Sequence, residues 1–292
     1  MKTGSVIGVD LGGTKVGIAR YSIDSWKQLE QSTIPTHAEE GFPAVYKSVC
    51  KHIADFVTPD TRALGFGVAG LVESRTGKLL RAPNIPKSEG QQLQRMLAKM
   101  FRLPVTVEND ARCFTYAEAM RGAGKGHSVV VGITMGTGVG GGIVVDGKIF
   151  HGHHGFAGEI GHALLRPGEP PYPTDDRRGE VEQFLSGTAM GHRCTAAKKP
   201  EEYLEGAVCS FLQPQVFREV AWLVASLTSI LDPSVIVFGG STGRALGPHL
   251  KEVRSELEQW VLPGLPLPKL TVGTLVDAST LGAALIAAIQ RR

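Results

Sequence analysis

Three polar side chains in succession, Glu108, Asn109 and Asp110, follow the short apolar run PVTV. A carboxylate at the end of a strand can accept the proton of a substrate hydroxyl during phosphoryl transfer, and an adjacent amide can orient that hydroxyl. This chemistry predicts Asp110 as a general base and Asn109 as an orienting group. An Asn-Asp pair alone is also a common turn sequence, so the assignment depends on its surroundings.

Glycine-rich turns follow strand-like runs at three places. They are DLGGTK at 10–15, MGTGVGG at 135–141 and FGGST at 238–242. Glycine lets successive backbone N–H groups converge on phosphate oxygens, and the side chains of Thr14, Lys15 and Thr137 add further donors. Asp10 could hold a hydrated Mg²⁺, which prefers oxygen ligands. One such loop alone would be an ordinary hairpin turn, whereas three in this order predict a phosphate site.

Two other nucleotide motifs are rejected. Gly136, Gly138 and Gly141 match the dinucleotide fingerprint G-x-G-x-x-G, but that fingerprint requires a helix immediately afterwards. Here GIVVDGKIF follows, which predicts a strand and a hairpin turn. The segment RGAGKGH resembles a P-loop but has glycine, instead of Ser or Thr, after Lys125.

A proline-rich stretch at 158–182 places His162 among acidic residues, with Glu159 before it and Glu180 and Glu182 after it. Three interpretations are compatible with these residue types. The stretch could bind substrate hydroxyls, or His162, Asp175 and Glu180 could form a three-ligand site for zinc or manganese. His162 could also be a structural histidine.

The composition is that of an ordinary soluble protein of 292 residues, with 42% hydrophobic and 20% charged residues. The net charge of +3 is spread along the chain, which gives little support for nucleic-acid binding. No apolar run reaches the roughly 18 residues of a membrane span, and no apolar signal segment precedes Asp10, so we expect a cytoplasmic protein. The four cysteines lack C-x-x-C spacing and are predicted to be reduced and mostly buried: Cys50, Cys113, Cys194 and Cys209.

Strand-like and helix-like segments alternate along the chain, which predicts an α/β fold. Laying VDLGGTKVG over ITMGTGVGG pairs Val9 with Ile133 and Gly12 with Gly136. This weak internal repeat of a strand-turn-strand unit predicts two related domains. Asp146-Gly147 is predicted to be a hairpin turn.

Together these motifs resemble the ROK family of bacterial sugar kinases and sugar-responsive repressors, within the actin-like ATPase superfamily. The segments that carry the resemblance span nearly the whole chain: DLGGTK, APNIP at 82–86, VENDA at 107–111, GTGVGGGIVVDGKIFHGHHGFAGEIGH at 136–162, SGTA at 186–189 and VIVFGGS at 235–241. The resemblance implies two actin-like (ribonuclease H-like) α/β domains with an interdomain cleft. We expect a smaller domain from residues 1–115 and 278–292 and a larger one from residues 116–277.

The resemblance also implies a role for each matching residue. Asp110 is the catalytic base, and the predicted sugar-contacting residues are Asn84, Asn109, Asp110, Glu159, His162 and Glu182. The predicted nucleotide-binding residues are Asp10, Gly12, Gly13, Thr14 and Lys15 in a first phosphate loop, Gly136, Thr137 and Gly138 in a second, and Gly239 and Gly240 in an adenosine motif.

In many family members the loop before the residue matching Glu182 carries three cysteines that bind zinc together with the histidine matching His162. Counting back from Glu182 places Pro173, Asp175 and Glu180 at those positions. We therefore expect no structural zinc and a sugar-binding role for His162. Pairing of Arg177 or Arg178 with a nearby acid, and the stiffness of the prolines, are expected to order the loop instead.

The predicted function is phosphorylation of a hexose hydroxyl, with glucose C6 favoured, using ATP and Mg²⁺. Fructose, mannose, allose or an N-acetylhexosamine are alternative substrates, and polyphosphate is an alternative donor. A non-catalytic sugar sensor is the competing function, although the nine residues before Asp10 leave no room for the DNA-binding segment of the family's repressors. The resemblance further implies a homodimer. The dispersed charge and the lack of a long apolar run predict no nucleic-acid or membrane partner.

Overall fold

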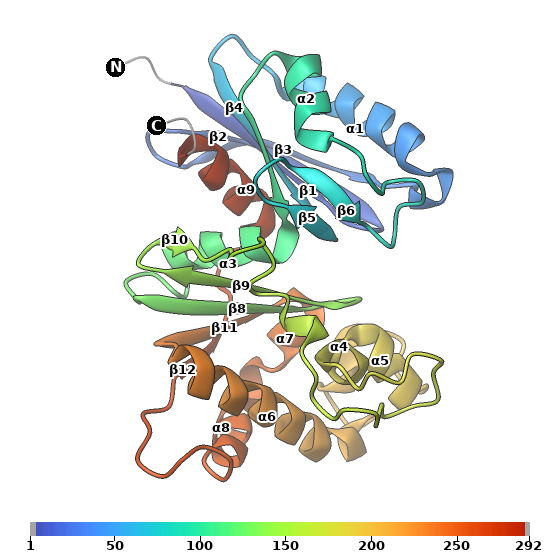
Figure 1. The fold of residues 1–292 in the computed structure, drawn as a ribbon, viewed down its shortest axis with the longest axis vertical. Coiled ribbons are helices and arrows are strands. Elements are labelled where there is room, and N and C mark those ends of the chain that lie inside the picture. The colour runs from blue at the N-terminus through green and yellow to red at the C-terminus, as the bar shows by residue number, and fades with distance from the viewer. Residues whose placement is uncertain (1–3, 290–292) are drawn as a thin grey trace. The chain divides into compact units, whose positions relative to one another are not determined.

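The computed structural model describes residues 4–289, which fall into two compact units (Figure 1). Unit 1 comprises Met1–Ala117, His151–Ala157 and Val276–Arg292, and unit 2 comprises Glu118–Phe150 and Gly158–Leu275. The larger domain expected from the sequence, residues 116–277, includes residues 151–157. In the structure this segment packs with unit 1, although it is flanked on both sides by chain of unit 2.

Unit 1 is built on a five-stranded sheet of order β3-β2-β1-β4-β7, in which β1, β4 and β7 are parallel and the neighbours β1–β2 and β2–β3 are antiparallel. Its elements are β1 (Ser5–Leu11), β2 (Lys15–Ser22), β3 (Gln28–Pro35), η1 (Ala38–Glu40), α1 (Phe42–Phe56), β4 (Thr61–Val68), the hairpin β5 (Leu71–Glu73) and β6 (Lys78–Arg81), α2 (Leu93–Phe101), β7 (Val105–Asn109), α3 (Asp110–Arg121), which extends into unit 2, and α9 (Ala278–Ile289).

Helices pack on both faces of this sheet, and successive side chains of β1 point to opposite faces. Ile7 and Val9 pack in one buried cluster with residues of α1, whereas Val6 packs in another with alanines of α9. Gly8 points to the α9 face, where a Cβ would collide with the carbonyl oxygen of Thr280. The close approach of α9 therefore explains a glycine in the middle of a buried strand.

Unit 2 has a second five-stranded sheet, of order β10-β9-β8-β11-β12, with the same arrangement of antiparallel and parallel pairs. Its elements are β8 (Val129–Met135), β9 (Val139–Val145), β10 (Lys148–Ile149), η2 (Ile160–His162), α4 (Val181–Leu185), α5 (Gly187–Arg193), η3 (Pro200–Tyr203), η4 (Ser210–Leu212), α6 (Gln213–Leu231), β11 (Val235–Gly239), α7 (Gly240–Ala245), η5 (Gly247–His249), α8 (Leu250–Leu257) and β12 (Lys269–Val272).

The internal repeat predicted from the sequence corresponds to the first hairpin of each sheet. Strands β1 and β8 end at Leu11 and Met135, and strands β2 and β9 begin at Lys15 and Val139. The overlay that pairs Val9 with Ile133 brings these ends into register. The two predicted phosphate loops therefore occupy equivalent turns in the two sheets.

The prediction of four reduced thiols is wrong for two of the cysteines. Cys194, at the end of α5, and Cys209, just before η4, form a disulfide with a Cα–Cα distance of 6.1 Å. The segment between them folds back through η3, a closure that the spacing of the cysteines does not reveal. Cys50 and Cys113 are free and buried, as predicted. In the described residues, no helix is long and apolar enough to cross a membrane.

Candidate functional site

Two carboxylates of unit 1, Asp10 and Asp110, lie at the same edge of its sheet. Asp10 is near the end of β1, and Asp110 begins α3 directly after β7. Burial, and then the nearby charge of Asp110, raise the pKa of Asp10 to about 7, although Lys15 acts in the opposite direction. Burial also raises the pKa of Asp110, against the hydrogen bond that its Oδ1 accepts from the Ala111 N–H at 2.9 Å. A pair of partly buried carboxyl groups with raised pKa values is typical of a site for proton transfer or cation binding.

The side chain of Asn109 is engaged in holding this corner of the sheet. Its Nδ2 donates to the carbonyl oxygen of Gly70 at 3.0 Å, and its Oδ1 accepts from the backbone N–H of Arg112 at 3.1 Å. The predicted contact of Asn109 with a sugar would therefore come from a side chain that is fixed by the backbone around it.

Glu108, which precedes Asn109 and Asp110 in the sequence, is buried and accepts three hydrogen bonds. The donors are the Asn109 N–H at 2.8 Å, a guanidinium N–H of Arg112 at 3.1 Å and Nε2 of His151 at 2.6 Å. Burial opposes ionisation of Glu108, but the bond from His151 and the charge of Arg112 outweigh it, so the pKa of this carboxyl is lowered. The role of His151 is not visible in the sequence, because the residue lies 43 positions from Glu108 along the chain.

The first phosphate loop is closed by contacts from outside the motif. The Gly12 N–H donates to the Lys15 carbonyl at 3.1 Å within the turn. Thr36, which follows β3, donates its hydroxyl to the Gly12 carbonyl at 2.8 Å and its backbone N–H to the Thr14 carbonyl at 3.0 Å. The predicted sugar ligand Asn84 lies beside this loop, since a Cβ on Gly13 would be 2.9 Å from its Nδ2. Thr36 was missed because only the pairing of β2 with β3 brings it to the loop.

The second phosphate loop and the adenosine motif are adjacent in unit 2. Gly136 closes the loop by donating its N–H to the Gly138 carbonyl at 2.9 Å, and the Thr137 side chain is exposed. Gly239 ends β11, and Gly240 begins α7 with a φ of 75°, a conformation that favours glycine. A Cβ on Gly240 would collide with the backbone of Met135, which directly precedes the second loop.

The stretch at 158–182 is ordered by polar contacts within the loop. Nδ1 of His162 lies 3.2 Å from Oε2 of Glu180, and a guanidinium nitrogen of Arg178 lies 3.0 Å from the same oxygen. This confirms the prediction that an arginine of the loop pairs with a nearby acid. Glu180 is buried, whereas the His162 side chain is 49% exposed. The exposure of His162 argues against a structural histidine within the core.

Gln183, on α4, holds the end of the same loop. Its side-chain oxygen accepts the backbone N–H groups of Gly179 and Glu180, and its amide nitrogen donates to the carbonyl oxygen of Asp176. A cavity of about 920 Å³ lies along the loop and includes Tyr172, whose ring stacks on His192 with a centroid distance of 4.5 Å. None of the predicted sugar-contacting residues lines this cavity.

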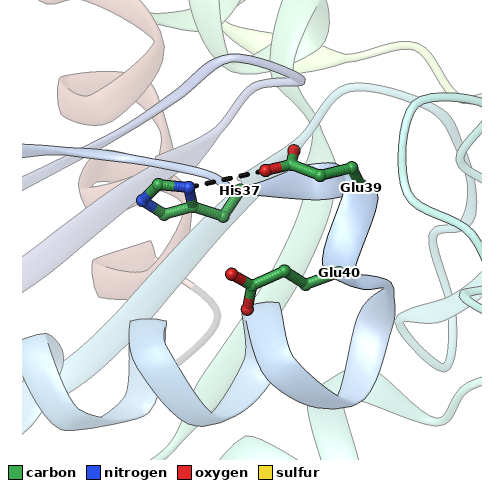
Figure 2. Close-up of side chains that lie close together, drawn as sticks. All are labelled: His37, Glu39 and Glu40. Carbon is green, nitrogen blue, oxygen red and sulfur yellow. Dashed lines mark ion pairs between the residues drawn. The ribbon is translucent and has the colours of Figure 1, made fainter.

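Within the described part of the chain, one group of three residues could bring its ligand atoms together around a metal ion. It consists of His37, Glu39 and Glu40, with ligand atoms within 4.8 Å of one another (Figure 2). All three are exposed, and Nδ1 of His37 lies 3.6 Å from a carboxylate oxygen of Glu39. The alternative metal site of His162, Asp175 and Glu180 is not formed as such a group in the described residues.

Comparison with known proteins decides the family. The sequence model of the ROK family matches residues 6–290. The chain belongs to the ROK family. It is 31% identical to the glucokinase of Streptomyces coelicolor over 292 aligned positions, covering 89% of each chain.

Two solved ROK structures have the same fold. The ROK hexokinase of Thermus thermophilus has a TM-score of 0.82 and 31% identity, covering 98% of this chain and 99% of its own. A ROK family glucokinase from Streptomyces griseus, in complex with glucose and AMPPNP, has a TM-score of 0.79 and 30% identity, covering 98% of this chain and 100% of its own. The expected actin-like α/β fold with two domains is therefore confirmed.

The structure divides the predicted ROK site residues between the two units. Unit 1 contains the first phosphate loop with Asp10, and the predicted sugar ligands Asn84, Asn109 and Asp110. Unit 2 contains the second phosphate loop, the adenosine motif, and the predicted sugar ligands Glu159, His162 and Glu182. Within each unit, a predicted sugar ligand touches a phosphate loop, Asn84 at Gly13 and Glu182 at Gly138.

Proposed function

We propose that this ROK protein transfers the γ-phosphoryl group of ATP to the C6 hydroxyl of glucose. The protein is an ATP-dependent sugar kinase, as its family membership and its similarity to glucokinases support. The observation that carries the proposed mechanism is the partly buried carboxylate of Asp110 beside Asp10, at the sheet edge that also holds the first phosphate loop.

In this mechanism Asp110 acts as the general base. Its carboxylate accepts the proton of the sugar hydroxyl while the hydroxyl oxygen forms a bond to the γ-phosphorus. The bond from that phosphorus to the β,γ-bridging oxygen breaks, and ADP leaves with the electron pair. The raised pKa of Asp110 suits this role, because it makes the carboxylate a stronger proton acceptor near neutral pH. Backbone N–H groups of the glycine loops stabilise the charge on the phosphates.

The chemistry of the carboxylate pair fits a magnesium ion. Asp10 and Asp110 are partly buried and have raised pKa values, so a cation beside them would offset the repulsion between their charges. Asp10 would hold hydrated Mg²⁺ through oxygen ligands, as this ion prefers. When bound, Mg²⁺ would neutralise charge on the phosphate groups during transfer.

The predicted sugar ligands suit a polyol. These ligands include both hydrogen-bond donors and acceptors: Asn84, Glu159, His162 and Glu182. The hydroxyls of a hexose can pair with such groups in a fixed pattern. A site of this type rejects a sugar that lacks one of the recognised hydroxyls, because a polar group is then left unpaired. Fructose, mannose, allose and N-acetylhexosamines are the alternative acceptors.

The decisive experiment incubates the purified protein with Mg²⁺-ATP and a panel of hexoses, and it measures ADP and sugar phosphate separately. Equal amounts of ADP and glucose 6-phosphate are expected, with fastest turnover on glucose. Replacing ATP by polyphosphate tests the donor, and metal analysis of the same sample tests for zinc. Sugar binding without turnover of any hexose would overturn the kinase assignment in favour of a sensor.

We further propose that the enzyme is a cytoplasmic homodimer with no nucleic-acid or membrane partner. The family resemblance supports the dimer, and the low net charge of +3, spread along the sequence, gives little support for nucleic-acid binding. Light scattering coupled to size-exclusion chromatography would test the dimer, and a single 31.1 kDa species would contradict it.

A further inference from the structure

Glu182 touches the second phosphate loop as well as serving as a predicted sugar ligand. Its Oε2 accepts the backbone N–H of Val139 at 2.8 Å. The same oxygen occupies the space beside Gly138, where a Cβ would collide with it. A larger residue at Gly138 would therefore displace this carboxylate from its present position.

The residues that follow Glu182 hold the same loop at two more points. The backbone N–H of Gly187 donates to the Gly136 carbonyl at 2.7 Å, and the hydroxyl of Thr188 donates to the Thr137 carbonyl at 2.8 Å. Because a peptide unit is planar and trans, fixing these two carbonyls also fixes the N–H groups of Thr137 and Gly138, which point the opposite way. The segment 182–188 thus sets the direction of the donors expected to meet phosphate.

The connection between these residues is short and stiff. The Ser186 N–H donates to the Glu182 carbonyl at 3.2 Å, and the Ser186 hydroxyl accepts from the Ala189 N–H at 3.0 Å, which caps α5. The adenosine-motif helix α7 approaches the same point, since a Cβ on Gly187 would lie 3.7 Å from the hydroxyl oxygen of Thr242. Glu182 is therefore linked to the loop directly, through the Val139 N–H, and along the chain through Ser186 and Gly187.

We propose that Glu182 is a positioning residue for the second phosphate loop and that it couples sugar binding to nucleotide binding. A sugar that binds the Glu182 carboxylate fixes its position. The hydrogen bond from the Val139 N–H then fixes the end of the loop as well. By linkage, a nucleotide that orders the loop then favours the sugar by the same factor. The inference rests on the proposed sugar kinase function and adds a role in nucleotide binding to a residue predicted to bind the sugar.

The first experiment compares Glu182→Gln with Glu182→Leu. Glutamine keeps a side-chain oxygen that can accept the Val139 N–H, whereas leucine has similar size and no acceptor. The affinity for AMPPNP in the absence of sugar is measured by calorimetry. We expect near-normal affinity for Glu182→Gln and a loss of about fivefold for Glu182→Leu, the usual effect of one hydrogen bond. Wild-type affinity in Glu182→Leu, or an equal loss in both variants, would overturn the proposal.

The second experiment uses two glycines of unit 2 and measures glucose affinity without nucleotide. Gly138→Ala pushes a Cβ against the Glu182 carboxylate and should weaken glucose binding severalfold. In Gly247→Ala, outside every predicted site, the new Cβ meets only ordinary contacts with Val272, so glucose affinity should be unchanged. Equal glucose affinity in the two variants would contradict the coupling. Wild-type turnover is assayed in parallel, and its absence would overturn the proposed function, whereas normal turnover with unchanged variant affinities would overturn this inference alone.

Discussion

At the scale of single residues, the proposed base is tested by Asp110→Asn. The amide has nearly the same shape but cannot accept the hydroxyl proton, so kcat is expected to fall by about 100- to 10,000-fold. The Oδ1 of asparagine can still accept the Ala111 N–H, so the turn should persist. Single-turnover kinetics measures the loss, and glucose affinity by calorimetry serves as the control. Turnover within a few-fold of wild type would refute Asp110 as the base.

Asp10 has a consequence for stability that can be measured without substrate. Its pKa rises from 3.8 to about 7 on folding, so the folded state prefers the protonated form. Folding is therefore opposed increasingly as pH rises from about 4 to about 7, and the penalty stays constant above that range. Asp10→Asn removes this charge, and its unfolding temperature should exceed that of wild type at pH 8 by on the order of 5 °C.

The control for this prediction is the same pair of proteins at pH 4, where the difference in unfolding temperature should shrink. Excess Mg²⁺ at pH 8 should also narrow the gap, because the ion would bind the wild-type carboxylates and stabilise the folded state. An Asp10→Asn variant that is less stable than wild type at pH 8 without magnesium would contradict the conclusion that the charge of Asp10 destabilises the folded state.

The sequence predicted the residue types of the site better than their hydrogen bonds. Asp10 and Asp110 were recognisable because each follows an apolar strand, and the structure places them at one sheet edge. The engagement of the Asn109 amide with Gly70 was not predictable, since it depends on a turn 39 positions earlier in the chain. Thr36 was missed for the same reason, because its contacts with the first phosphate loop are tertiary.

At the scale of elements, the disulfide is the main departure from expectation and is itself testable. Cys194 and Cys209 are separated by 15 positions. Closing a loop of that length stabilises a fold by about 3 kcal/mol in chain-entropy terms. Reduction with dithiothreitol, or Cys194→Ser, should lower the free energy of unfolding by about that amount in denaturant titrations. A matched Cys50→Ser variant controls for loss of a buried thiol without a bond.

The outcome also bears on the proposed compartment. A disulfide is unusual in a reducing cytoplasm. Thiol titration of protein purified under strictly reducing conditions should then detect four thiols after unfolding, against two in oxidised protein. Two thiols under reducing conditions would indicate a bond protected by its burial.

The elements themselves were largely predictable because their signals are local. The apolar spacing of 216–231 and the following Asp232-Pro233 indicate a helix end at this point. In the structure α6 ends at Leu231, and Asp232 adopts a left-handed φ of 44°. The Asp146-Gly147 turn was predicted from its dipeptide, and both residues have positive φ. The loop at 158–182 was different. Pairing of Arg178 was expected, but the bonds from Gln183 have no pattern that can be seen in the sequence.

At the scale of the whole molecule, the two sheets have the same pattern of antiparallel and parallel strand pairs, and each contains one predicted phosphate loop. The turn after β1 and the turn after β8 are equivalent, and each touches a predicted sugar ligand, Asn84 in unit 1 and Glu182 in unit 2. The division of the chain at 150 and 157 could not be predicted, because it follows from contacts such as that of His151 with Glu108, which lie far apart in sequence.

Because predicted sugar ligands belong to both units, saturating glucose should slow backbone hydrogen exchange in both. We expect protection at β7 and the start of α3, around Asp110, and at α4, around Glu182, each by severalfold or more, because ligand binding lowers the population of locally open states. Mass spectrometry of peptides from the two regions measures the effect, with α8, which carries no predicted site residue, as the internal control. Protection confined to one unit would mean that the sugar ligands assigned to the other unit are wrong, even if turnover on glucose is rapid.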